Sequence, residues 1–285
     1  MSKCYNFGMY IGVDIGGTQM RVGFFETSSE GELTLLEVKR TPVAADFDQG
    51  LTELFELIHS FPETSPLQGV GIGVPGSIDT EKGSIRSANN LKGWEGKPLA
   101  STASAKFNVP VQVENDAKLA TLGEAHAGFG KNLERFVYVI WGTGVGGAAA
   151  TKHQGKWIVE GCELGQQIVE WNGRECNCGQ KGCLEAYIGG LACQKRFGKP
   201  LSEITDPAVW EEIVMKAAQG ILNISMLHPT PLIVFGGGVI SHQAHLLPKI
   251  ATVLESQQKM YPPSELKLSQ LGDEAGMYGG AALFL

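Results

Sequence analysis

Apolar residues in the first part of the chain follow two spacings, one typical of strands and one of helices. Runs that alternate or are rich in β-branched residues predict strands. Leu51, Leu54, Phe55 and Ile58 recur at helical spacing and predict a helix. The expected order is three strands, a helix, a strand, a short helix and a strand, over residues 10–13, 19–26, 33–41, 48–61, 69–74, 98–107 and 109–113.

The same order of elements begins again in the second part of the chain. Three strands, a helix, a strand and a helix are expected over residues 136–140, 146–151, 155–159, 210–228, 232–235 and 242–258. This repetition predicts two α/β lobes of similar topology with a cleft between them. We expect the first lobe to span 1–114, with a C-terminal helix at 273–285 packing back onto it. The second lobe, at 115–272, would contain the clustered cysteines.

Composition limits the class of protein and its partners. The chain has 285 residues, 43% of them hydrophobic and 19% charged, with a net charge of −7. This length suits two domains. No basic run is present, so we expect no nucleic-acid partner. The N-terminal segment does not resemble a signal peptide and no apolar run could span a bilayer, so we expect a cytoplasmic location and no membrane contact.

Glycine turns follow several of the expected strands. In the segment from Asp14 to Thr18, Gly16 and Gly17 allow a tight turn whose backbone N–H groups could cradle phosphate. Thr18 adds a hydroxyl, and Asp14 could hold Mg²⁺ directly or through water. The alternative is an ordinary glycine hairpin.

Two later glycine runs repeat this pattern in the second lobe. Gly142, Thr143 and Gly144 form the same kind of turn after the strand at 136–140. The run of Gly236, Gly237 and Gly238 leaves room for a flat group such as adenine with its ribose, or is only a turn into the next helix. Two runs match the dinucleotide fingerprint, beginning at Gly71 and Gly142, but neither is followed by a helix, which argues against a nicotinamide enzyme.

The stretch VENDAKLATLGE at 113–124 places Asn115 and Asp116 at a strand-to-helix corner. Open α/β sheets bind ligands at such corners. The alternative is that one of these residues only caps the helix.

Three of the six cysteines, Cys176, Cys178 and Cys183, lie within eight residues of one another in sequence. In a chain without an export signal this clustering indicates a metal site rather than disulfides.

Taken together, these motifs resemble the ROK family of sugar kinases over almost the whole chain. The motifs occur in the family's order: Asp14-Ile-Gly-Gly-Thr18, Val74-Pro-Gly76, Asn89-Asn-Leu91 with Trp94, Asn115-Asp116, Gly142-Thr-Gly144, Glu163-Leu-Gly165, Cys176-x-Cys178-Gly-x-x-Gly-Cys183-Leu-Glu185 and Gly236-Gly-Gly238. The resemblance implies a two-lobe, actin-like ATPase fold, a ribonuclease-H-like duplicated α/β architecture with its active-site cleft between the lobes.

The resemblance also assigns roles to individual residues. Asp116 would be the catalytic base. The sugar would contact Gly76, Asn89, Asn90, Asn115, Asp116, Glu163, Gln166 and Glu185. ATP and Mg²⁺ would contact Asp14, Gly16, Gly17, Thr18, Gly142, Thr143, Gly144, Gly236, Gly237 and Gly238.

This chain departs from the family at the zinc site that the resemblance implies. The family has a His that completes a Cys₃His zinc site, and Gln166 occupies that position here. A Gln amide can still hydrogen-bond a sugar hydroxyl, but it is a poor zinc ligand. Cys176, Cys178 and Cys183 could therefore bind Zn²⁺ with a fourth ligand from elsewhere, remain as free thiols, or oxidise.

The favoured function is an ATP-dependent hexose kinase that phosphorylates the 6-hydroxyl of glucose. Alternatives within the class are N-acetylmannosamine, another N-acetylhexosamine, or fructose as acceptor. One alternative from another class is a sugar-sensing regulator, but the first glycine turn begins at Asp14, which leaves no room for the helix-turn-helix domain that we expect ahead of the sugar domain in such a protein. Another is a non-catalytic sugar-binding relative, against which the presence of Asp14 and Asp116 argues. The resemblance also implies a homodimer.

Overall fold

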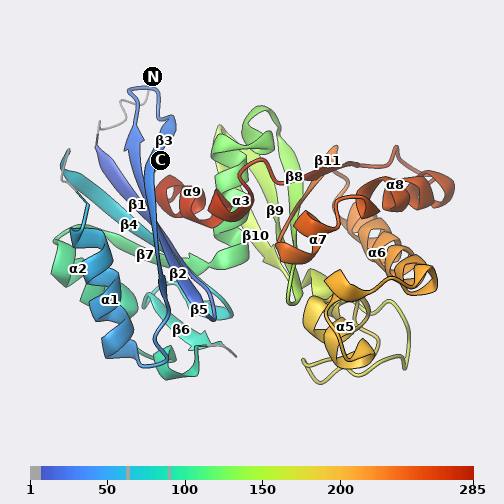
Figure 1. Ribbon diagram of the computed structural model, residues 1–285. Helices are drawn as coiled ribbons and strands as arrows, with labels where there is room; N and C mark the ends of the chain where they lie inside the picture. The colour runs from blue at the N-terminus through green and yellow to red at the C-terminus, as the bar shows by residue number, and fades with distance from the viewer. Residues whose placement is uncertain (1–7, 62–64, 89–90) are drawn as a thin grey trace. The chain divides into compact units, whose positions relative to one another are not determined.

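The chain divides into two compact units, each containing a five-stranded sheet (Figure 1). The computed structural model describes residues 8–61, 65–88 and 91–285. The first unit is Met1–Lys131 with Glu274–Leu285, and the second is Asn132–Asp273.

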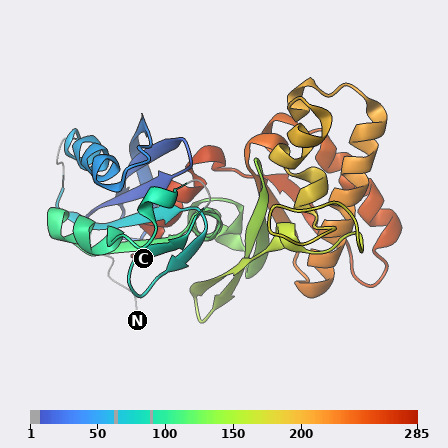
Figure 2. The same ribbon diagram turned by 90° about the horizontal axis from the view of Figure 1, so that it is seen from below.

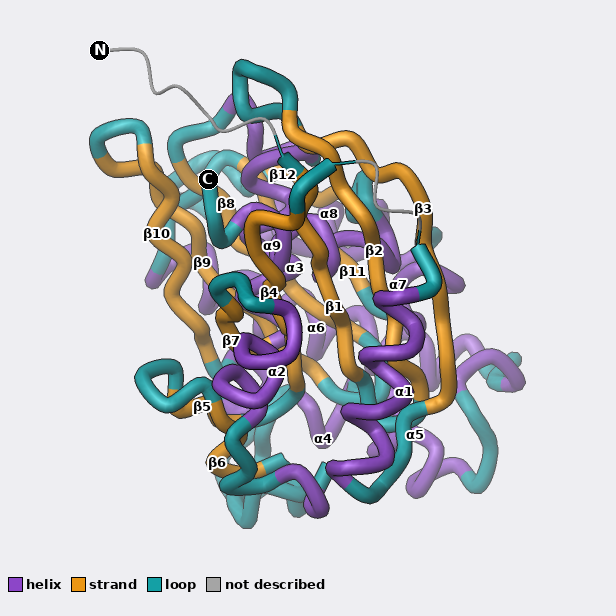
Figure 3. The backbone as a smooth tube through the Cα atoms, turned by 90° about the vertical axis from the view of Figure 1, so that its left-hand side faces the viewer, coloured by secondary structure: helices purple, strands orange, loops and turns teal. Residues whose placement is uncertain are grey.

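The sheet of the first unit has the strand order β3-β2-β1-β4-β7 (Figure 3). Its strands are β1 (Met9–Ile15), β2 (Gln19–Thr27), β3 (Leu33–Pro42), β4 (Leu67–Val74) and β7 (Val111–Asn115). β1, β2 and β3 run antiparallel in succession, whereas β4 lies parallel to both β1 and β7. A separate small hairpin consists of β5 (Ser77–Asp79) and β6 (Ser84–Ser87).

Helices cover both faces of this sheet. α1 (Phe47–His59) and α2 (Leu99–Phe107) lie on one face, and α3 (Asp116–Ala127) and α9 (Ala275–Ala282) lie on the other (Figure 1). α1 begins after Asp46, whose side chain accepts a hydrogen bond from the backbone of Gln49 at 3.0 Å. Its buried stripe includes Leu51, Leu54 and Ile58, as the sequence predicts. Short 3₁₀ turns occur at η1 (Lys92–Trp94) and η2 (Phe129–Asn132).

Glycines let α9 approach the sheet and α3 at backbone-to-backbone distance. A β-carbon at Gly12 of β1 would lie 1.8 Å from the Met277 carbonyl oxygen, and one at Gly279 would lie 1.8 Å from the Leu119 carbonyl oxygen. One at Gly123 would lie 2.1 Å from a carbonyl oxygen at the start of α9. This contact places α3 in the first unit, whereas the sequence analysis begins the second lobe at residue 115.

The second unit repeats the topology of the first. Its sheet has the order β10-β9-β8-β11-β12, with strands β8 (Arg135–Trp141), β9 (Val145–His153), β10 (Lys156–Cys162), β11 (Leu232–Gly236) and β12 (Glu265–Leu268). β8, β9 and β10 are successively antiparallel, and β11 is parallel to β8 and β12. Each strand therefore has a counterpart of the same direction in the first sheet, which confirms the predicted duplication.

Most helices of the second unit gather beside its sheet, coloured yellow to red in Figure 2. They are α4 (Glu185–Ile188), α5 (Gly190–Phe197), α6 (Pro207–Leu227), α7 (Gly238–His242) and α8 (Leu246–Gln257), with 3₁₀ turns η3 (Leu164–Gln166), η4 (Leu201–Glu203) and η5 (Gly272–Glu274). Within the described ranges, no helix combines the length and apolarity needed to cross a membrane.

The single helix expected at 242–258 is two helices. α7 ends at His242, and α8 begins at Leu246. Pro248 lies in the first turn of α8, where its missing N–H leaves no intrahelical bond unmade. In one continuous helix the same residue would have lost a bond to the carbonyl four positions earlier, so a break before it is favoured.

Gly279→Ala tests whether the contact between α9 and α3 holds the first unit together. Alanine favours a helix over glycine by about 1 kcal/mol, but the added carbon would collide with the Leu119 carbonyl. Overpacking of this kind costs about 1–3 kcal/mol, so we expect a net loss in the free energy of unfolding, measured with denaturant. Gly146→Ala in β9 is the control, because its β-carbon would meet nothing within 4 Å. Equal stabilities of the two variants would contradict the account.

Candidate active site

The candidate residues of the first unit lie where its parallel strands end. Asp14 near the end of β1 is in register with Gly73 of β4, and Val74 is in register with Asn115 of β7. The carboxyl ends of parallel strands form one edge of a sheet, and open α/β sheets bind ligands there. The edge thus brings Asp14, the turn after β4 and the strand-to-helix corner at residues 115–116 close together.

Asn115 is the residue that caps α3. Its side-chain oxygen accepts hydrogen bonds from the backbone N–H groups of Ala117 (3.0 Å) and Lys118 (3.2 Å). Its amide nitrogen donates to the carbonyl oxygen of Gly76 at 3.1 Å. Gly76 has φ +92°, and a β-carbon there would lie 2.1 Å from the Ser87 carbonyl oxygen, so the turn requires glycine.

Asp116 is the first residue of α3, and its carboxylate is not needed as the helix cap. The side chain is half-buried, and Oδ1 accepts a hydrogen bond from the Ala117 backbone at 2.8 Å. Burial raises the pKa of the Asp116 carboxyl above its ordinary value, while hydrogen bonds from the backbone and from Asn115 partly oppose the rise. A carboxylate with a raised pKa accepts a proton more readily, which suits a general base.

The first glycine turn joins β1 and β2. The Gly16 N–H donates to the Gln19 carbonyl oxygen at 2.9 Å, and Gly17 and Thr18 are exposed at its tip. The Asp14 side chain is 25% exposed and lies 3.7 Å from Nη1 of Arg21. This partly exposed carboxylate offers the oxygen ligand that Mg²⁺ prefers.

The second glycine turn joins β8 and β9, and its carbonyl groups accept hydrogen bonds from the start of α5. The Gly142 N–H donates to the Gly144 carbonyl at 3.0 Å. The N–H groups of Gly190 and Leu191, at the start of α5, donate to the carbonyls of Gly142 and Thr143, each at 2.9 Å. No acceptor in the described part of the chain takes the N–H groups of Thr143 and Gly144, which remain available to an anion.

A cavity of about 450 Å³ lies beside this turn, entirely within the second unit. Its volume is typical of a small-molecule site. It is lined by Gly142, Thr143, Gly190, Leu191, Gln194, Pro200, Leu201, Ser202, Gly238, Val239, His242 and Gln243. Backbone N–H groups that can bind an anion, beside a cavity with both apolar and polar lining, could accommodate a nucleotide.

The three glycines after β11 have different roles. A β-carbon at Gly236 would lie 2.0 Å from the Tyr138 hydroxyl oxygen, so this glycine is needed for packing. Gly237 has φ +97°, so it is needed for its conformation. Gly238 begins α7 and lines the cavity, where a β-carbon would meet nothing within 4 Å. Of these three glycines, Gly238 is the one that leaves open space for a ligand.

Two candidate sugar-binding segments meet at the start of β9. One contains Glu163 and Gln166, and the other contributes the side chain of Glu185. The Val145 N–H donates to Oε2 of Glu185 at 2.8 Å. A β-carbon at Gly165 of η3 would lie 2.2 Å from the Val145 carbonyl oxygen, so η3 packs on the same residue. Glu163 is exposed at the start of η3.

Gln166 and its neighbour Gln167 differ in their contacts. Gln167 donates to the Leu164 carbonyl at 2.8 Å and accepts from Asn223 at 3.0 Å, so it is structural. The Gln166 side-chain oxygen is buried and has no hydrogen-bond partner among the described residues. A buried oxygen without a partner is costly, so the Gln166 oxygen could accept a hydrogen bond from a donor that reaches it.

The three clustered cysteines converge as the sequence predicts. The sulfurs of Cys176, Cys178 and Cys183 all lie within 4.8 Å of one another, and those of Cys178 and Cys183 are 3.6 Å apart. Burial and the neighbouring thiols raise the pKa of Cys183 to about 12, whereas the backbone N–H of Gln180 lowers the pKa of Cys178. Within the described ranges no His, Asp or Glu joins this cluster. The donor set therefore fits three corners of a tetrahedral zinc site and lacks a protein ligand for the fourth.

Some candidate residues lie outside what the structure describes, and others were missed from the sequence. Asn89 and Asn90 fall outside the described residues. The cavity-lining residues Leu191, Gln194 and His242 were not predicted. They lie on α5, an eight-residue helix that the sequence analysis did not predict, and on α7. The signal that could have found α5 was Gly189-Gly190 followed by an amphipathic run.

Comparison with known proteins gives the family. The model of the ROK family matches residues 10–285. A glucokinase of Thermotoga maritima is 35% identical over 65% of this chain, a match that spans 58% of that protein. An N-acetyl-D-glucosamine kinase of Escherichia fergusonii is 30% identical, with 97% of this chain and 99% of that protein covered.

Solved structures agree with this match. A ROK family glucokinase from Streptomyces griseus, in complex with glucose and AMPPNP, aligns with a TM-score of 0.77 at 26% identity, covering 97% of this chain and 99% of that one. The neighbours have the two-lobe, actin-like ATPase fold, which confirms the predicted fold class. The chain belongs to the ROK family.

Proposed function

We propose that this chain is an ATP-dependent hexose kinase that phosphorylates the 6-hydroxyl of its sugar, with glucose as the first candidate. The class, an ATP-dependent sugar kinase, is supported by membership of the ROK family and by the named activities of its relatives. The identity of the sugar and the roles of single residues are our proposals.

The observation that carries the proposal is the Asp116 carboxylate at the end of β7. Asn115 already caps α3, so Asp116 is available for chemistry. A sugar hydroxyl is a weak nucleophile, and a carboxylate within hydrogen-bond reach accepts its proton as phosphoryl transfer proceeds. We propose that Asp116 is this base.

Positioning and charge neutralisation would supply the rest of catalysis. The glycine turns at 16–18 and 142–144 would hold the phosphates, and the cavity beside Gly238 would hold the nucleoside. Asp14 would hold Mg²⁺, which when bound neutralises charge on the phosphates.

The sugar would be held by amide and carboxylate side chains suited to rings of hydroxyl groups. We propose Asn115, Glu163, Gln166 and Glu185 as ligands, with Gly76 allowing close approach. The unpartnered Gln166 oxygen supports a donating hydroxyl there. Asn89 and Asn90 remain predictions from the resemblance.

The choice of sugar has a second candidate. Relatives of similar identity are named glucokinase and N-acetyl-D-glucosamine kinase. An N-acetylhexosamine, including N-acetylmannosamine, is therefore the alternative, and fructose is a weaker one. A coupled assay of ADP release over glucose, fructose and the N-acetylhexosamines separates them. The family resemblance also implies a homodimer, which light scattering in solution would test.

We further propose that Cys176, Cys178 and Cys183 supply three thiolate ligands to Zn²⁺, with water as the fourth. Their convergence supports this site. A bound Zn²⁺ would favour the deprotonated form of these three thiols and would offset the repulsion among their charges.

Asp116→Asn tests the proposed base. The amide keeps the shape of the side chain but accepts a proton poorly, so we expect turnover to fall about 10²–10⁴-fold while sugar binding, measured by calorimetry, largely survives. Asp46→Asn is the control, because it changes the same group at the cap of α1, where Asn serves as well as Asp. Unchanged turnover in Asp116→Asn would rule out Asp116 as the general base.

Asp116→Asn should lower turnover, but it should not lower the free energy of unfolding at neutral pH. Because burial raises the pKa of Asp116, the folded state is penalised when the carboxylate is charged. The contribution of Asp116 to the free energy of unfolding is therefore fully present below the pKa of the unfolded carboxyl and is lost as pH rises through the folded pKa. We expect Asp116→Asn to be as stable as the natural chain or more so at neutral pH, in denaturant unfolding. This advantage should shrink as pH falls, and an advantage that grew instead would contradict the sign.

Gly238→Val tests the proposed nucleoside cavity. The added side chain enters open space rather than the protein, so the fold should persist. We expect the KM for ATP to rise about tenfold or more through lost space for the ligand, with little change in sugar affinity. An unchanged KM for ATP would place the nucleotide elsewhere.

A further inference from the structure

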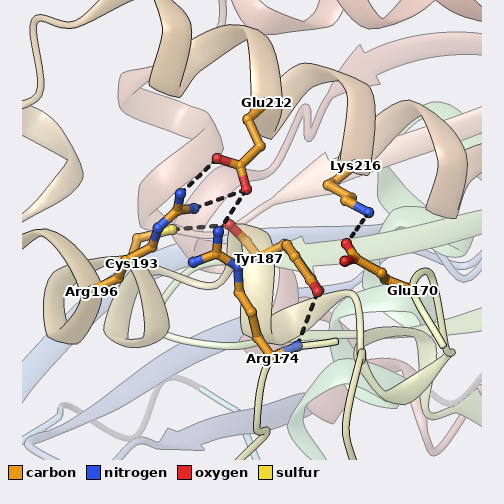
Figure 4. Close-up of polar contacts among 7 residues, drawn as sticks. All are labelled: Glu170, Arg174, Tyr187, Cys193, Arg196, Glu212 and Lys216. Atoms are coloured by element: carbon orange, nitrogen blue, oxygen red, sulfur yellow. Dashed lines mark hydrogen bonds and ion pairs between the residues drawn. The ribbon is translucent and has the colours of Figure 1, made fainter. Parts of the chain in front are cut away.

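The loop that carries the three cysteines is joined to two helices through one carboxylate. We define the cysteine loop as residues 167–184, between η3 and α4. Glu212 of α6 accepts hydrogen bonds from Arg174 in this loop at 3.0 Å and from both terminal nitrogens of Arg196 on α5, at 3.0 and 2.7 Å (Figure 4). Loop, α5 and α6 therefore meet at Glu212.

Tyr187 of α4 forms the second part of this network. Its hydroxyl accepts a hydrogen bond from the Arg174 backbone N–H at 3.0 Å. The Arg174 guanidinium and the Lys216 ammonium lie 5.0 and 4.6 Å from its ring centroid. Lys216 in turn donates to Glu170 of the loop at 2.7 Å, and the Cys193 thiol donates to the Tyr187 carbonyl at 3.2 Å (Figure 4).

The network connects to the proposed active site through α4. Glu185 and Tyr187 belong to the same short helix, and Glu185 accepts from the Val145 N–H beside the second glycine turn. The Trp141 indole donates to the Ile188 carbonyl at 2.8 Å. A displacement of α4 would therefore move Glu185 relative to that turn.

The backbone of the cysteine loop is closed by bonds that use no thiol. The Gly182 N–H donates to the Arg174 carbonyl at 2.7 Å, and the Val169 N–H donates to the Gly182 carbonyl at 2.8 Å. Among the residues that the structure describes, the thiol cluster offers three ligands to a cation, one fewer than a tetrahedral site needs. The contacts of Arg174, Tyr187 and Glu212 act on the loop without any metal.

We propose that Glu212 is a positioning residue: the ion pairs it makes with Arg174 and Arg196, rather than a cation at the thiols, hold the cysteine loop and α4 so that Glu185 faces the second glycine turn. This inference rests on the proposed function where it treats Glu185 as a sugar ligand. The positioning of the loop itself is independent of that function.

Geometry distinguishes this network from ordinary surface ion pairs, which contribute little. The Arg196 pair is made through two nitrogens, and the three side chains are only 28–36% exposed. The pKa of Glu212 is lowered by its hydrogen bond from Arg196, which agrees with a carboxylate stabilised in its charged form. Loss of this charge would leave two guanidiniums without their common partner.

Glu212→Gln tests the proposal, with Glu211→Gln as the matched control. Glu211 is the exposed neighbour on the same helix, so the two variants remove the same charge. We expect amide hydrogen exchange over residues 169–183 to become about tenfold faster in Glu212→Gln only. We also expect the KM for the sugar to rise by about the same factor, with kcat and the KM for ATP changed little. Glu212→Asp keeps the carboxylate and should show smaller increases in both the exchange rate and the KM for the sugar.

Metal removal is the second arm. The natural chain is treated with a thiol-competing zinc chelator and then returned to Mg²⁺. We expect exchange over 169–183 and sugar KM to stay within about twofold of the untreated chain, since the network persists. Faster exchange after chelation, or equal exchange in the two glutamine variants, would overturn the proposal.

The positioning role of Glu212 can still be tested if Glu212→Gln does not fold or if no sugar is phosphorylated. If Glu212→Gln does not fold, Arg196→Lys keeps the positive charge while removing the paired hydrogen bonds, and the same exchange result is expected from it. If no sugar is phosphorylated, the proposed function fails, but the exchange measurements still decide the positioning role.

Discussion

The two hydrogen bonds that the Asn115 side chain accepts from the first turn of α3 determine what Asp116 can do. A strand-to-helix corner needs an acceptor for its unpaired N–H groups, and Asn115 supplies it. Asp116, one residue later, is then held at the sheet edge with a half-buried carboxylate and a raised pKa. If Asp116 were the cap, both helix N–H groups that Asn115 now binds would be bound by the Asp116 carboxylate instead, which would make that carboxylate a poorer base.

The second unit uses the same topology for different chemistry. Its β8–β9 turn corresponds to the β1–β2 turn, but here α5 braces the turn and a cavity opens beside it. Glycine has separate uses in this unit: Gly236 permits packing, Gly237 permits a backbone conformation and Gly238 leaves ligand space. The duplicated topology thus gives each unit a sheet edge of the same kind. The local sequence determines which chemical groups lie at each edge.

The sequence predicted the sheets well because alternation and short buried runs are local signals. It could not separate Asn115 from Asp116 as the cap, because both residue types cap well and only the hydrogen bonds decide. It began the second lobe at residue 115, because the contact between Gly279 and Leu119 joins distant parts of the chain. The cavity residues on α5 and α7 were missed for the same reason: they converge through tertiary packing rather than through a motif.

The most direct test of the account is to incubate the purified chain with ATP, Mg²⁺ and glucose, or the hexose preferred in the panel, and follow the products by ³¹P NMR. The account predicts a new phosphate monoester at the sugar 6-position, formed in step with ADP. Formation of inorganic phosphate without a sugar ester, or no consumption of ATP with any hexose, would contradict it.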